Sequence, residues 1–86
     1  MLLGRDRHAS AEDISSGPDA LFRLGLAHSI GAETEEERVA AHKWFSLAAL
    51  RGSAEAAGHR RQLAETMTPK EIVRAQRAAR QWLTFH

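Results

Sequence analysis

Two alanine-rich stretches constrain the fold of this chain more than any other feature of its sequence. The first reads ALFRLGLA over residues 20–27, and the second reads HKWFSLAALRG over residues 42–52. In both, small residues recur beside large apolar ones at helical spacing, which predicts two helices that pack closely against each other. Gly25 supports this, because a mid-helix glycine costs about 1 kcal/mol relative to alanine and is explained by a neighbouring helix that needs the space.

Helix-start and helix-stop signals divide most of the chain into four segments. Pro18 is a favourable first residue for the first helix, and Gly31 is a natural left-handed stop after it. Thr34 and Glu37 have the spacing of a capping box at the start of the second helix. We therefore expect helices over residues 18–30, 35–51, 54–66 and 69–85.

The third and fourth helices have start signals of the same kind. Ser53 is a candidate cap for the third helix, and Gly52 ends the helix before it. A cap, a first-turn proline and a capping glutamate stand together at Thr68, Pro69 and Glu71. Because the loops are short, consecutive helices should be antiparallel neighbours. The expected fold is therefore all-α, with two antiparallel helical hairpins.

The length of the chain allows one small domain. With 86 residues and many alanines among its apolar positions, the chain can bury only a modest core. The segment 1–17 is polar, and we expect it to be partly disordered or to form one short helical turn. Residues 18–86 are expected to form a helical-repeat domain.

An internal period accompanies this pattern. Ala20 and Ala56 occupy equivalent helix positions 36 residues apart, which indicates two copies of one helical hairpin. The motifs in question are Ala20-x-x-x-Leu24-Gly25, the turn at Gly31, AHKWFSLAA over residues 41–49, GSAEA over residues 52–56, and the closing segment over residues 67–82.

These motifs resemble the Sel-one-like repeats, a family of tetratricopeptide-like helical repeats. The resemblance covers about residues 18–83, with one clear repeat and a divergent terminal hairpin in which Arg60 and Arg61 stand in place of a Leu-Gly pair. It implies a short bacterial protein that folds as a right-handed α–α superhelix and acts as an adaptor or scaffold in protein complexes. It implies no catalytic residues.

Composition narrows the compartment and the class of partner. The chain has no cysteine, which excludes disulfides and thiolate metal sites. Its sequence shows no apolar stretch of membrane-spanning length, so we expect a cytoplasmic protein and no membrane partner. The net charge of +1 makes a nucleic-acid partner an unfavoured expectation, although the second half of the chain is basic and the first half acidic.

No residue pattern indicates a reaction. The five histidines lack the four-residue spacing of a helical metal pair, and no glycine-rich phosphate loop is present. The carboxylates Glu35 and Glu37 stand at a helix start, where a capping role accounts for them. We expect no enzymatic activity, no catalytic residues, no metal and no cofactor.

The remaining residues divide into a predicted core and a predicted partner-binding surface. We expect the core to contain Leu24, Gly25, Ala40, Trp44, Leu47, Ala48, Leu63, Ile72, Ala75, Ala79 and Trp82. The first hypothesis is a protein–protein interaction module that docks an unidentified protein or peptide between the first and third helices. Its candidate binding residues are Leu21, Phe22, His28, Arg60 and Arg61.

Two alternatives stay open. Because two repeats leave apolar ends uncovered, the chain can be a self-associating structural element that forms a homodimer. A third hypothesis is weak nucleic-acid binding through the fourth helix, with a basic patch made by Arg60, Arg61, Arg74, Arg77 and Arg80.

Overall fold

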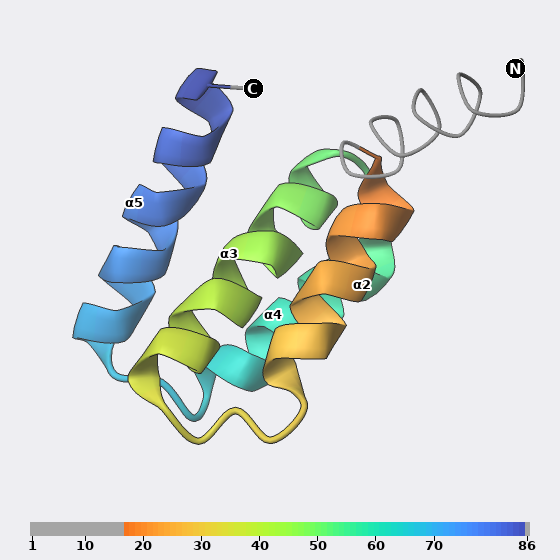
Figure 1. Ribbon diagram of the computed structural model, residues 1–86. Coiled ribbons are helices and arrows are strands. Elements are labelled where there is room, and N and C mark those ends of the chain that lie inside the picture. Colours follow the sequence, from red (N-terminus) through yellow and green to blue (C-terminus); the bar gives the residue numbers. More distant parts are fainter. Residues whose placement is uncertain (1–16, 86) are drawn as a thin grey trace, which may run out of the picture.

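A computed structural model describes residues 17–85, which form four α-helices joined by short loops (Figure 1). These are α2 (Pro18–Ser29), α3 (Glu35–Leu50), α4 (Ala54–Ala64) and α5 (Pro69–Phe85). No strand occurs in this described part of the chain. The all-α class and the four expected helices are thus confirmed. The expected N-terminal disorder or turn falls on residues 1–16, which lie outside the described residues.

The helix starts follow the local signals in the sequence. Pro18 occupies the start of α2, and the Thr34 and Ser53 side chains accept hydrogen bonds from the N–H groups of Glu37 and Ala56 at the starts of α3 and α4. The capping box differs in one detail, because Glu37 Oε1 accepts from the N–H of Glu33 rather than from that of Thr34. Each cap satisfies a backbone donor that the helix itself leaves unpaired.

Helix α3 is the centre of the structure, because α2, α4 and α5 all pack against it (Figure 1). Its sequence allows this, since small and apolar residues occur on several sides of the helix. The main core cluster joins α2, α3, α4 and α5 and consists of Leu21, Ala41, Phe45, Leu47, Ala48, Ala56 and Ala79. A smaller cluster of Val39, Met67 and Ala75 lies between α3 and the start of α5.

The contact between α2 and α3 depends on Gly25. A Cβ atom on this residue would lie 2.4 Å from Cδ1 of Phe45, far inside van der Waals contact. Phe45 is only 1% exposed, so its ring has no free space to move into. The glycine therefore lets the α2 backbone approach the ring directly, as the sequence predicts for a close helix pair.

The second half of the fold differs from a simple hairpin. α5 packs along α3, where Trp82 meets Trp44 edge-on with ring centroids 5.9 Å apart. α4 packs mainly on α3 and touches α2, and α4 and α5 diverge from the loop that connects them (Figure 1). α5 therefore differs from the second arm of a closely packed α4–α5 hairpin, because it buries its apolar stripe on α3. The right-handed superhelix stays a prediction.

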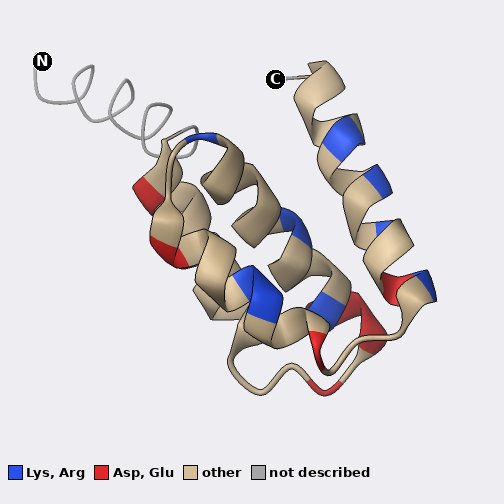
Figure 2. Ribbon diagram, turned by 180° about the vertical axis from the view of Figure 1, so that it is seen from behind, with Lys and Arg blue, Asp and Glu red and all other residues tan. Residues whose placement is uncertain are grey.

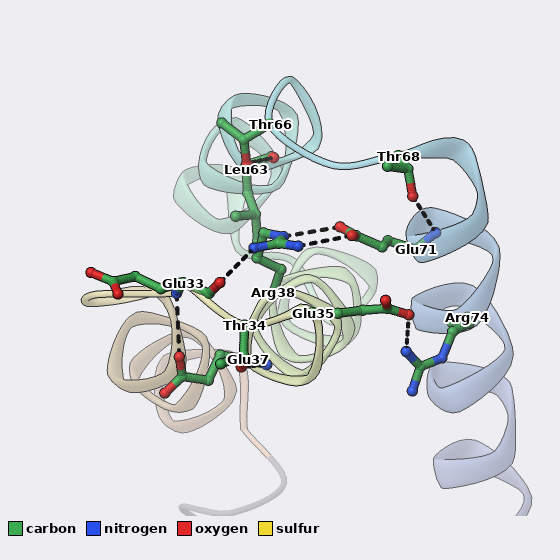
Figure 3. Close-up of polar contacts among 10 residues, drawn as sticks. All are labelled: Glu33, Thr34, Glu35, Glu37, Arg38, Leu63, Thr66, Thr68, Glu71 and Arg74. Atoms are coloured by element: carbon green, nitrogen blue, oxygen red, sulfur yellow. Dashed lines mark hydrogen bonds and ion pairs between the residues drawn. The ribbon is translucent and has the colours of Figure 1, made fainter.

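Two ion pairs fasten the beginning of α5 to the beginning of α3 (Figure 3). The Arg38 guanidinium donates two hydrogen bonds to the Glu71 carboxylate, at 3.0 and 2.8 Å, and Glu35 pairs with Arg74. The hydrogen bonds from Arg38 lower the pKa of Glu71. The Glu71 side chain reaches across to α3, and a hydrogen bond from the Thr68 backbone also helps to lower its pKa, as a capping glutamate would receive. Thr68 in turn caps α5 by accepting from the N–H of Glu71.

The predicted core residues do not all lie equally deep. Those fully or nearly buried are Gly25, Leu47, Ala48, Ala75 and Ala79. Those half-buried are Leu24, Ala40, Trp44, Leu63, Ile72 and Trp82. For Ala40, the neighbouring Ala41 is the residue that faces the core, because one step along a helix turns a side chain by about 100°.

Candidate functional site

A groove with a volume of about 680 Å³ opens where α4 and α5 diverge over α3. α3 forms its floor, α5 forms one wall, and Arg60 of α4 stands on the other side. The residues that line it are His42, Ser46, Leu47, Leu50, Arg60, Gln76, Ala79, Arg80 and Leu83. We refer to this feature as the α4–α5 groove.

Helical periodicity places these side chains in the groove. On α3, His42, Ser46 and Leu50 recur every four residues and therefore share one face. On α5, Gln76 and Leu83 are seven residues apart and lie on the flank next to the one that packs on α3. The groove thus runs about two helical turns along both helices, or roughly 11 Å at about 1.5 Å per residue.

His42 forms a polar but uncharged part of the floor. Its side chain is 4% exposed, and its Nδ1 lies 3.4 Å from the hydroxyl of Ser46. Burial lowers the pKa of His42, and the positive charge of Arg60 lowers it further. The imidazole is therefore neutral near pH 7 and adds no charge to the groove.

The charged side chains of the groove are both arginines, Arg60 and Arg80. No carboxylate lines it, and among residues 17–85 neither guanidinium forms an ion pair. Two leucines at the rim, Leu50 and Leu83, are 67% and 38% exposed. The groove therefore combines unneutralised positive charge with uncovered apolar surface.

The basic residues elsewhere on α5 are placed differently. Figure 2 shows Lys and Arg recurring along α5, whereas acidic residues gather around the starts of α3 and α5. Arg74 is engaged by Glu35, and Arg77 is exposed outside the groove. The predicted basic patch is thus divided, with Arg60 and Arg80 in the groove and Arg74 in an ion pair.

The residues predicted to bind a partner between the first and third helices do not form one surface. Leu21 is fully buried against α3, so it is unavailable to a partner. Phe22 is half-buried, packs on Phe45, and forms a T-shaped contact with the His59 ring, with ring centroids 5.1 Å apart. His28 is half-buried near the end of α2. Arg60 lies in the α4–α5 groove, whereas Arg61 is exposed outside it.

The sequence reasoning missed most of the groove-lining residues. Two signals for them were present, namely the four-residue spacing of His42, Ser46 and Leu50 and an apolar residue, Leu83, beside the core stripe of α5. Neither signal was decisive, because the groove exists only where α5 leaves α4, and that divergence depends on tertiary packing.

No reaction centre accompanies the groove. Among the residues described, no three His, Cys, Asp or Glu side chains stand close enough to hold a metal ion. No helix in that same range is both long and apolar enough to cross a bilayer. The side chains that line the groove are two arginines, an imidazole, an amide, a hydroxyl and four apolar groups.

No protein-family model, no curated protein and no solved structure gives a significant match to this chain.

Proposed function

We propose that this protein is a non-enzymatic adaptor module that docks a segment of a partner protein in the α4–α5 groove. The observation that carries the proposal is that, within residues 17–85, Leu50 and Leu83 are exposed beside Arg60 and Arg80, and these two arginines form no ion pair there. Exposed apolar surface next to fixed polar groups is typical of a binding site.

The family resemblance supports the same function and is part of the proposal. The Sel-one-like motifs, the close α2–α3 pair at Gly25 and the helical architecture are consistent with a repeat protein that binds other proteins. The absence of a catalytic pattern from the sequence also favours binding over chemistry. We place the protein in the cytoplasm and expect no cofactor.

Peptide display followed by binding to a variant with a blocked groove tests the proposal. Peptides are first selected for binding to the whole wild-type protein, and their binding to Gln76→Trp, which puts a bulky ring in the groove, is then measured. The matched control is Gln81→Trp, which makes the same change at an exposed α5 position outside the groove. We expect Gln76→Trp to abolish binding of the selected peptides and Gln81→Trp to retain it. Equal binding by both variants would reject this groove as the docking surface.

Self-association is a second candidate, favoured by the apolar residues near the ends of α3 and α5. Leu50, Leu83 and Phe85 are exposed there, and both helices end on the same side of the molecule (Figure 1). Light scattering over a wide concentration range decides this point. A dimer would support self-association, whereas a monomer at every concentration would reject it.

A further inference from the structure

We propose that the segment bound in the α4–α5 groove is an acidic amphipathic helix of a partner protein. This inference rests on the proposed function and adds the chemistry of the partner. Such a helix would set apolar side chains between Leu50 and Leu83 and direct carboxylates to Arg60 and Arg80.

Charge complementarity is the first argument. Arg60 and Arg80 stand on opposite walls of the groove, and none of the described residues that line it carries a carboxylate. A guanidinium in a partly enclosed site favours a carboxylate partner, because its planar fork matches the two carboxylate oxygens. The fold already contains one such pair, in which the Arg38 guanidinium donates two hydrogen bonds to the Glu71 carboxylate. The neutral His42 adds no competing charge between the arginines.

The shape of the groove is the second argument. Two helices wall a channel that runs about two turns over a third helix, and apolar residues Leu47 and Ala79 lie between the polar ones. A helix lying in such a channel presents side chains at i, i+3 or i+4, and i+7 to one face. Two or three apolar side chains of that face match the length of the groove. Carboxylates on the flanks of the same helix then meet the two arginines.

The direct test uses labelled helical peptides and fluorescence anisotropy with the full chain. The first peptide carries leucines at i, i+3 and i+7 with glutamates on both flanks of that stripe. In two matched peptides every glutamate becomes glutamine or lysine, and in a fourth a central proline prevents the helix. We expect the wild-type protein to bind the glutamate peptide at least about tenfold more tightly than the glutamine peptide. The lysine and proline peptides should bind weakest.

Charge reversal then locates the contact. Arg80→Glu should lower the affinity for the glutamate peptide by about tenfold and raise the affinity for the lysine peptide. Arg77→Glu makes the same charge change on α5 at an exposed position outside the groove, and should alter binding by less than about threefold. Circular dichroism checks that both variants keep the wild-type helix content.

Each other outcome rejects the inference in a distinct way. Equal binding of the glutamate and glutamine peptides would overturn the acidic partner and leave groove docking intact. In another outcome, the four designed peptides all fail to bind, while the display experiment yields peptides of other chemistry whose binding is lost in Gln76→Trp. That result would also overturn the acidic partner and leave docking in the groove intact. An oligonucleotide that binds with the same Arg80 dependence would identify nucleic acid instead. A dimer abolished by Arg80→Glu would identify a second copy of this chain.

Discussion

Replacing Gly25 with alanine tests the closest contact of the fold. The added Cβ would lie 2.4 and 2.5 Å from two carbons of the Phe45 ring, against about 3.5–4.0 Å for an optimal contact. Overpacking of this kind costs about 1–3 kcal/mol, and an overlap of this size belongs at the upper end. Alanine regains about 1 kcal/mol of helix propensity. We therefore expect a net loss of about 2 kcal/mol in the free energy of unfolding.

The chain offers a matched control for this substitution at Gly58 in the middle of α4. A Cβ there meets nothing within 4 Å, so alanine gains the propensity without the overlap. Gly58→Ala should stabilise the protein by about 0.5–1 kcal/mol. Urea unfolding followed by circular dichroism measures both variants. A Gly25→Ala protein as stable as Gly58→Ala would refute the claim that α2 needs a glycine against Phe45.

A double-mutant cycle identifies the ring as the cause. In the Phe45→Leu background the smaller side chain makes room for the new methyl group. Gly25→Ala should then cost less than in the wild-type protein, or even stabilise. An unchanged cost in the two backgrounds would show that the overlap with Phe45 is not what Gly25 avoids.

Three further predictions concern titration and capping. Because burial lowers the pKa of His42, the unfolded chain takes up the proton first, and stability should fall as the pH drops below the ordinary value of 6.5. In a plot of the urea unfolding midpoint against pH, His42→Gln should make the fall below pH 6.5 less steep. An unchanged slope would contradict the conclusion that buried His42 causes this fall. Because Arg38 lowers the pKa of Glu71, that carboxylate stabilises the fold above the ordinary value of 4.5 and less as the pH falls below it. Glu71→Gln should therefore lower the thermal midpoint at pH 7 more than Glu35→Gln, which removes an exposed pair, and the opposite order would show that the buried pair is dispensable. Thr34→Ala removes the cap of α3 and should cost about 1 kcal/mol in urea unfolding, whereas no loss would mean that water replaces the cap.

Local signals predicted the helix starts because each one acts within a single turn. Pro18, Thr34, Ser53 and Thr68 all stand at helix starts, and each affects only backbone groups a few residues away. The end of α4 was less well placed. It stops at Ala64 because the next turn closes with bonds between residues three apart, so no strong sequence signal marks it.

Long-range partners were beyond the reach of the same reasoning. The spacing of Glu71 from Thr68 predicts its capping role, but nothing in that spacing predicts its ion pair with Arg38, 33 positions earlier in the chain. That pair helps to hold α5 on α3. The direction of α5 in turn decides where the groove opens, so the sequence could not indicate a groove between α4 and α5. Propensity and spacing cannot rank such competing partners, because the choice depends on packing between distant segments.

Mapping the bound peptide on the protein by NMR tests the central claim most directly. The glutamate peptide is added to isotope-labelled protein, and the backbone amide shifts are followed through the titration. We predict that the largest changes lie on α3 from His42 to Leu50, at Arg60, and on α5 from Gln76 to Leu83. The outward side of α2 should stay unchanged. Changes centred on α2, or no saturable change anywhere, would contradict the assignment of the α4–α5 groove as a docking site for an acidic helix.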